Sequence, residues 1–101
     1  MDIETANQDP VRQASEDDLR GILAGDFGST VTLVRNYGDR FEAAAEPGAG
    51  YRLTYYDAVS GRRWAALEAL SLDQVKEAFC DYFQGNWNWH GRQTWRPIEL
   101  V

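Results

Sequence analysis

The clearest element in this chain is the run Ser71-Leu72-Asp73-Gln74-Val75-Lys76-Glu77-Ala78-Phe79-Cys80-Asp81-Tyr82-Phe83-Gln84-Gly85. Ser71 and Gln74 have the spacing of a capping box, in which each side chain accepts a hydrogen bond from the other residue's backbone N–H. Gly85 favours a helix end because glycine readily adopts the left-handed conformation found there. One apolar stripe recurs at helical spacing and contains Leu72, Val75, Phe79, Tyr82 and Phe83. The sequence therefore predicts a helix over about 72–84 that packs on one face of a sheet.

The residues before this helix predict an antiparallel sheet. Apolar and polar residues with strand-forming side chains alternate in four segments, at 29–35, 40–45, 51–56 and 62–70. Short reversals join these segments, so neighbouring strands should pair antiparallel. A shorter helix is expected at about 16–24, with Ser15 as its N-cap. The sequence thus predicts an α+β fold: a short N-terminal helix, a four-stranded antiparallel meander, the amphipathic helix on one sheet face, and a tryptophan-rich C-terminal tail.

The length of the chain and the composition of its two ends indicate how its domain is organised. A chain of 101 residues fits one domain. Residues 1–14 are polar and show no periodicity, so we expect a flexible acidic lead-in there and a single α+β domain over 15–101. Pro97 disfavours a central strand. A short edge strand or terminal arm is expected from Ile98, Leu100 and Val101.

The charge of the chain is negative and uneven. The net charge is −6, and residues 1–26 alone contain seven acidic residues and two arginines. A concentrated acidic end disfavours nucleic acid and anionic membranes as partners and favours a basic protein. The alternative is a solvated segment that serves only solubility. Neither a signal peptide nor an apolar run of membrane-spanning length is present, so we expect a cytoplasmic protein that does not enter a membrane.

Reactive side chains are too few for a recognisable catalytic or metal site. The chain has one histidine, His90, and one cysteine, Cys80. A catalytic triad needs a nucleophile, a base and an orienting acid, and a zinc site usually needs several histidine or cysteine ligands. His90 is typical of a surface imidazole, and Cys80 of a structural cysteine beside the helix stripe. We expect no enzymatic activity, no metal and no cofactor.

The tail is unusually rich in tryptophan. Three of the four tryptophans lie within nine positions, namely Trp87, Trp89 and Trp95. Tryptophan and arginine are enriched in binding hot spots, which makes Arg92 a further candidate. Stacking on the bases of single-stranded nucleic acid is a second use of such residues, but the negative net charge opposes it. Trp87 and Trp95 are expected to cap the core while the tail packs along the sheet, with a binding role as the alternative. Trp89 is the better candidate for exposure because it neighbours His90 and Gly91 at the expected loop tip.

The helix and the tail together resemble the ending of a known family. The run over 70–85 is followed by Trp95 and then by Ile98-Glu99-Leu100. This arrangement resembles the small immunity proteins of bacterial polymorphic-toxin systems, one family of which closes with an acidic helix bearing an alanine-phenylalanine pair, a short turn and a tryptophan-bearing segment. In that family an Arg-Pro pair often precedes the tryptophan, whereas here Arg96-Pro97 follows it.

The resemblance implies a non-catalytic inhibitor that binds one cognate toxin in the cytoplasm and occludes its active site. Toxins that act on nucleic acid have basic clefts, and an acidic inhibitor associates quickly with such clefts. The expected partner contacts are Glu16, Asp17, Asp18, Asp26, Trp89 and Arg92. Two other functions stay open: a structural or accessory domain that forms a homodimer through a sheet edge or the aromatic tail, and a small-ligand binder that uses Tyr55, Trp87 and Trp89.

Overall fold

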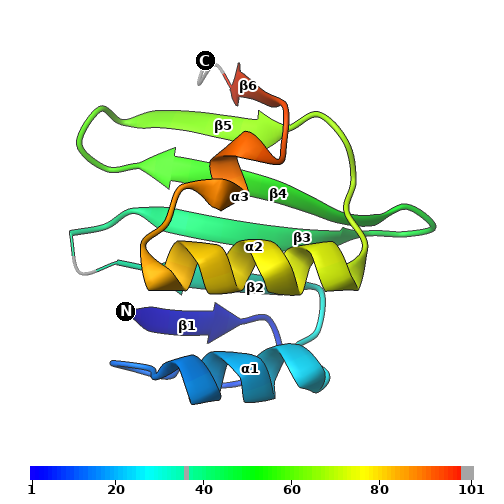
Figure 1. Ribbon diagram of the computed structural model, residues 1–101. Helices are drawn as coiled ribbons and strands as arrows, with labels where there is room; N and C mark the ends of the chain where they lie inside the picture. The colour runs from blue at the N-terminus through cyan, green and yellow to red at the C-terminus, as the bar shows by residue number, and fades with distance from the viewer. Residues whose placement is uncertain (36, 99–101) are drawn as a thin grey trace.

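The computed structural model describes residues 1–35 and 37–98. Within them the chain forms an α+β structure, in which one antiparallel sheet carries helices on one face (Figure 1). The strands are β1 (Asp2–Thr5), β2 (Thr30–Val34), β3 (Arg40–Glu46), β4 (Gly50–Asp57), β5 (Arg62–Ala66) and β6 (Trp95–Ile98). The helices are α1 (Glu16–Ala24), α2 (Leu72–Gln84) and α3 (Asn88–Gly91). Each strand pairs with its neighbour in sequence, so the antiparallel meander is confirmed.

The described residues form six strands in this sheet, not the four that the sequence predicts. The expected strands correspond to β2, β3, β4 and β5, although β5 ends at Ala66. Beyond that residue, Leu70 makes one isolated bridge to Tyr51 near the start of β4. The two additional strands, β1 and β6, pair on the outer sides of the expected meander and form the edges of the sheet.

The prediction of a flexible lead-in over residues 1–14 is wrong. β1 pairs with β2 along its whole length, and Ile3 is only 1% exposed. Ile3 and Val11 also exchange two backbone hydrogen bonds of 2.9 Å, so residues after β1 cover its outer edge. The Asp2 carboxylate accepts a hydrogen bond from the backbone N–H of Gln13, which lowers the pKa of Asp2. One buried side chain and backbone pairing therefore fix a segment whose composition is polar.

The opposite edge agrees with the expectation from Pro97. This residue lies opposite Trp64 of β5, in an edge strand. Proline lacks a backbone N–H, and it is tolerated in an edge strand because no further strand requires a hydrogen bond from that position. Ile98 belongs to this strand, as predicted, whereas Leu100 and Val101 lie outside the described residues.

The amphipathic helix is confirmed as α2, with both predicted ends. Ser71 Oγ accepts a hydrogen bond from the Gln74 N–H at 3.2 Å, and the Ser71 N–H donates to Gln74 Oε1 at 2.8 Å. Gly85 ends the helix in the left-handed region, at a φ of 81°. The helix buries Val75, Ala78, Phe79 and Tyr82. This stripe packs on Phe41 of β3, so α2 sits over the middle of the sheet.

The shorter helix is confirmed as α1, with Ser15 as its N-cap. Ser15 Oγ accepts a hydrogen bond from the Asp18 N–H at 3.1 Å, and the Asp18 carboxylate accepts one from the Ser15 N–H at 2.9 Å. This is a second capping box, with aspartate in the position usually held by glutamate or glutamine. The helix buries Leu19 and Leu23 and lies beside β1 (Figure 1).

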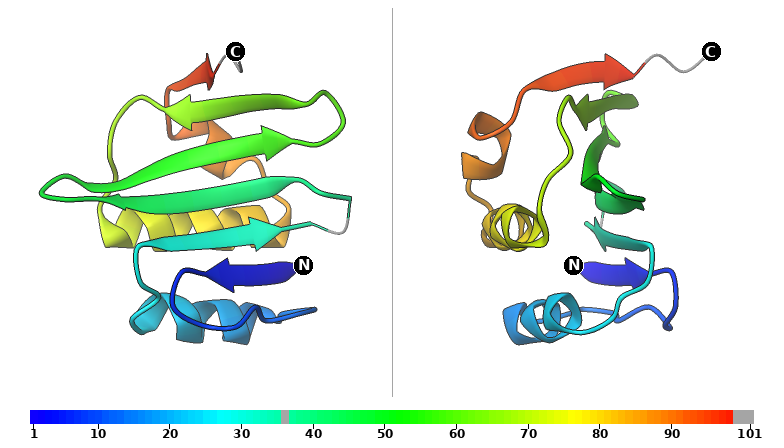
Figure 2. Two further views of the ribbon diagram at one scale, coloured as in Figure 1. Left: turned by 180° about the vertical axis from the view of Figure 1, so that it is seen from behind. Right: turned by 90° about the vertical axis from the view of Figure 1, so that its right-hand side faces the viewer.

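The two faces of the sheet carry different side chains because successive residues of a strand point to opposite faces. The helix-bearing face has an apolar row across all strands: Ile3, Leu33, Phe41, Tyr55, Trp64 and Pro97. Figure 2 shows that no described helix covers the other face. The register places four arginines on that uncovered face, namely Arg40, Arg52, Arg63 and Arg96. The same register places four acids there, Asp2, Glu4, Glu42 and Glu46, so the uncovered face is charged and mixed in sign.

Candidate binding site

The tryptophan-rich tail folds back over the helix-bearing face of the sheet. α3 follows α2 after the turn at Gly85 and lies in front of β4 and β5 (Figure 1). The sequence predicts a loop here and misses this short helix. The chain then reverses into β6, which returns to the sheet beside β5. This path brings Trp87, Trp89 and Trp95 beside Trp64 of β5.

The structure reverses the expected exposure of two tryptophans. Trp89, predicted at an exposed loop tip, is 4% exposed, and its ring centroid lies 5.0 Å from that of Phe41 and 5.4 Å from that of Tyr82. Trp87 is 70% exposed and stacks on Trp89, with 5.6 Å between ring centroids. Residues two apart in a helical turn do not share a face, so the turn that buries one exposes the other. Trp87 is therefore the candidate contact residue, and Trp89 supports it from beneath.

A pocket of about 170 Å³ opens beside Trp87, and we call it the tryptophan pocket. Its lining consists of Trp64, Trp87, Trp89 and Trp95 together with Tyr55, Asp57 and His90. The three residues named for a small-ligand site, Tyr55, Trp87 and Trp89, therefore do converge. Trp64 comes from β5 and Asp57 from the end of β4, and sequence reasoning assigns neither of them to a site.

Packing and hydrogen bonding hold the walls of the tryptophan pocket in place. Tyr55 and Trp64 are paired across neighbouring strands, and their rings stack with centroids 5.9 Å apart. Trp95 Nε1 donates a hydrogen bond to the His90 carbonyl at 3.0 Å. The Asp57 carboxylate accepts hydrogen bonds of 3.0 Å from Val59 and Ser60 of the β4–β5 turn. The pocket is thus formed by side chains whose orientations are already fixed.

A second hollow, also of about 170 Å³, adjoins the tryptophan pocket and shares Tyr55, Trp87 and Trp89 with it. Asp39 lies there, 5% exposed, and accepts a hydrogen bond of 3.0 Å from the Tyr55 hydroxyl. It also accepts one of 2.8 Å from the Ala58 N–H, so both carboxylate oxygens are engaged. Asp39 thus connects the start of β3 to Tyr55 of β4, which lines both hollows.

Tyr55 and Tyr82 lie beneath this site, and their raised pKa values predict that the protein loses stability at high pH. Burial raises the pKa of Tyr82 to about 12. Burial and the hydrogen bond to Asp39 also raise the pKa of Tyr55 above its ordinary value of 10.0. The unfolded chain releases these protons near pH 10 whereas the folded chain retains them. Their stabilising effect should therefore be complete below pH 10 and should be lost as the pH rises through about 12. Tyrosinate absorbance and circular dichroism, followed together, should show ionisation coinciding with unfolding.

Tyr82→Phe isolates this effect, because phenylalanine keeps the ring and removes the ionisable group. The variant should unfold at a higher pH than the unmodified protein when both are titrated under the same conditions. An alkaline midpoint that does not move would contradict the assignment of the pH dependence to Tyr82.

The acidic residues predicted as contacts divide into two sets. Asp17, Asp18 and Asp26 line one shallow hollow of about 280 Å³ beside α1. Glu16 faces α2 instead, where it accepts a hydrogen bond of 2.8 Å from Gln84. The structure thus gathers three of the four predicted acids on one surface and uses the fourth to join two helices.

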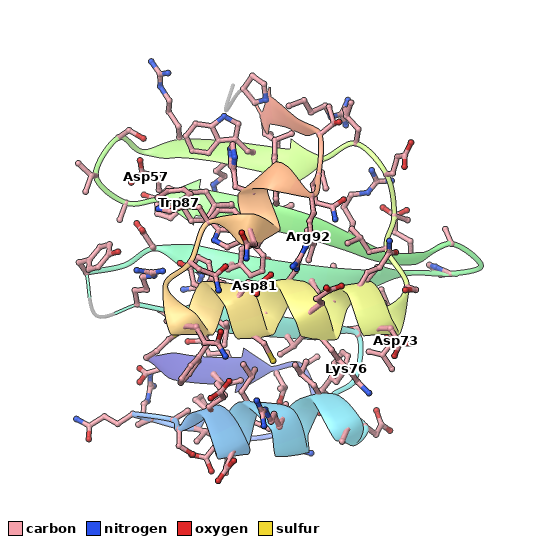
Figure 3. All side chains as sticks on the ribbon, viewed as in Figure 1. Asp57, Asp73, Lys76, Asp81, Trp87 and Arg92 are labelled. Atoms are coloured by element: carbon pink, nitrogen blue, oxygen red, sulfur yellow. The ribbon has the colours of Figure 1, made fainter. Side chains whose placement is uncertain are left out.

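Arg92 contacts residues of the same chain. Its guanidinium pairs with Asp81 and, at 3.4 Å, with Glu77, both on α2 (Figure 3). These ion pairs connect the end of α3 to α2 and hold the tail against the helix. The predicted contacts Trp89 and Arg92 therefore lie away from the hollow of Asp17, and both serve to position the tail.

The reactive side chains do not gather into one site. His90 is exposed at the tryptophan pocket, and Cys80 is half-buried on α2. Among the described residues, no group of three or more histidine, cysteine or acidic side chains has a geometry that could hold a metal ion. None of the helices in the described part of the chain is long and apolar enough to cross a membrane.

Comparison of the chain with other proteins found no family model, curated protein or solved structure that matches it.

Proposed function

We propose that this chain is a non-catalytic binding protein, an immunity-type inhibitor that acts in the cytoplasm and occludes the active site of a basic bacterial toxin. The observation that carries the proposal is the concentration of acidic residues on the two longer helices, α1 and α2. The helices present mainly acidic residues, whereas the strands place arginines and acidic residues in equal number on the uncovered face of the sheet. The resemblance of the helix and tail to immunity proteins adds to this observation.

Acidic residues dominate the helical side. Each of α1 and α2 contains three acids and one basic residue. These are Glu16, Asp17 and Asp18 with Arg20, and Asp73, Glu77 and Asp81 with Lys76. A surface of one sign attracts partners of the other sign and speeds their encounter, most strongly at low salt. A basic partner is therefore drawn to the helices rather than to the uncovered face of the sheet.

An exposed aromatic residue lies on the same side. Trp87 is 70% exposed, and tryptophan is among the residues that most often dominate binding free energy. Figure 3 shows Trp87 near the end of the acidic helix α2. Charge would then guide the partner to this side, and Trp87 would supply apolar contact once the complex forms.

Two charge reversals test the proposal. Asp17→Lys and Asp73→Lys change exposed residues, one on each acidic helix. Each should slow association with the toxin about three- to tenfold at low salt, with a smaller effect as salt rises. Glu42→Lys is the matched control, because it makes the same charge change on the uncovered face. Stopped-flow association kinetics measure all three variants.

The partner for this experiment is the product of the neighbouring upstream gene, co-expressed with the chain. Binding and protection of the host cell are the expected results. A product that neither binds nor is neutralised would remove the proposal. Slowing by Glu42→Lys equal to that by Asp17→Lys would show that the acidic helices do not direct the encounter.

Self-association through the aromatic tail is the second candidate, and the exposure of Trp87 is the observation that favours it. Pairing through β6 is disfavoured because Pro97 lacks a backbone donor. Sedimentation of the protein should then show a dimer that Trp87→Ala converts to monomer. A monomer at high concentration would exclude this candidate and leave the first.

A further inference from the structure

We infer that the tryptophan pocket binds an organic cation, in the form of an alkylated ammonium headgroup. This inference goes beyond the proposed function, because the pocket can be occupied whether or not a toxin is bound. It rests on the aromatic walls of the pocket, on the Asp57 carboxylate at its rim and on the size of the space.

The walls of the pocket are made mainly of aromatic side chains, which attract cations. The face of an aromatic ring is electron-rich, and tryptophan attracts cations more strongly than the other aromatic residues do. Four tryptophans and Tyr55 line this one small space. Trp87, the most exposed of them, leaves its outer surface in water. The pocket therefore offers several ring surfaces to one ligand, and Trp87 can form its outer wall.

The charge at the rim selects the sign of the ligand. Asp57 lies two residues after Tyr55 on β4, so both side chains lie on the helix-bearing face, and both line the pocket. Figure 3 shows Asp57 and Trp87 at the same end of the molecule. Each Asp57 oxygen accepts one hydrogen bond from the turn, at 3.0 Å, and retains acceptor capacity. Arg62 is opposite Asp57 in the register, yet no ion pair joins the two within the described residues.

The size of the pocket limits the ligand to a headgroup. Pockets for whole drug-sized ligands have volumes of roughly 300–1,000 Å³, whereas this one measures about 170 Å³. An alkylated ammonium group is compact, carries positive charge and has an apolar surface, so it suits both the rings and the carboxylate. Because hydrogen bonds and stacking already fix Trp95, Trp64 and Asp57, little conformational freedom is lost on binding.

Titration with small cations tests this inference without a protein partner. Tetramethylammonium and choline should give saturable changes in tryptophan fluorescence and in the indole N–H signals of an NMR spectrum. The neutral alcohol in which carbon replaces the nitrogen of choline should bind about tenfold more weakly, because it lacks the charge. Equal binding of the neutral alcohol, or no saturable change with either cation, would overturn the inference.

Matched variants locate the site. Trp87→Ala and Asp57→Asn should each weaken choline binding about tenfold, and unchanged backbone NMR signals elsewhere would show that both variants fold. Leu67→Ala and Asp17→Asn remove an exposed apolar group and an exposed charge that do not line the pocket, so they should bind as the unmodified protein does. An equal loss in Asp17→Asn would indicate general electrostatic attraction and would contradict the assignment to this pocket.

A second arm distinguishes the source of the cation. Short peptides with one trimethyllysine, one lysine or one alanine in the same sequence are compared with free choline. Tighter binding of the trimethyllysine peptide than of choline would assign the pocket to a side chain of a protein, and the reverse order would assign it to a free small molecule. Failure of the toxin experiment leaves both results standing, since neither titration contains the toxin.

Discussion

Gly50→Ala should destabilise this fold by about 2–5 kcal/mol, through backbone strain added to a backbone collision. Gly50 has a φ of 97°, which side-chain-bearing residues rarely adopt, and a Cβ there would lie 2.3 Å from the carbonyl oxygen of Leu70. That carbonyl cannot easily move, because it accepts a hydrogen bond of 2.8 Å from the Tyr51 N–H. The added methyl group should therefore disrupt the bridge between Tyr51 and Leu70, which lies between β5 and α2 in the chain. Denaturant unfolding measures the loss.

Gly48→Ala is the control, because it shares the strain without the collision. Gly48 has a φ of 76° and lies in the same reversal, but a Cβ there would meet nothing within 4 Å. We expect a loss of about 1–2 kcal/mol from the unfavourable φ alone. A loss in Gly48→Ala as large as in Gly50→Ala would show that the approach of Leu70 contributes nothing.

Local sequence signals were sufficient for α2 because several of them agree. Ser71 and Gln74 mark its start, Gly85 marks its end, and one apolar stripe lies between them. A helix of this length also gives the periodicity enough turns to be recognised. The same reasoning identifies α1, although Asp18 rather than glutamate completes its capping box.

The edge strand β1 could not be recognised in the same way. It contains one apolar residue, Ile3, between two acids, which is too short a pattern to distinguish a strand from a polar tail. The pairing with β2 and the bridge to Val11 supply the missing interactions, and these depend on residues far from β1 in the sequence. Tertiary contacts therefore decide this element.

For a related reason, the sequence predicts only some of the residues that form the tryptophan pocket. Tyr55, Trp87 and Trp89 are conspicuous by type, but the exposure of the last two depends on α3, which is four residues long and has no side-chain cap. Trp64 and Asp57 reach the pocket through the register of β4 and β5. A one-residue shift of that register would turn a side chain to the opposite face, so a sequence pattern alone does not place them together.

Phe41→Ala should cost about 3–5 kcal/mol and should also weaken the candidate binding site. Phe41 of β3 is fully buried and contacts side chains of both α2 and α3. Its ring stacks on Tyr82 of α2, with centroids 4.6 Å apart, and meets Trp89 of α3 edge-on, with centroids 5.0 Å apart. Removing it would leave a cavity beneath Trp89, on which the exposed Trp87 stacks at 5.6 Å.

The two consequences are measured separately on one sample. Denaturant unfolding gives the loss of stability, and choline titration under conditions where the variant is folded gives the effect on the pocket. Tyr37→Ala removes an exposed aromatic side chain from the neighbouring hollow and should change stability by less than about 0.5 kcal/mol. Choline affinity unchanged in folded Phe41→Ala would show that Trp89 keeps its position without this support. Weaker choline binding by folded Phe41→Ala would show that core packing around Phe41 positions the tryptophan pocket.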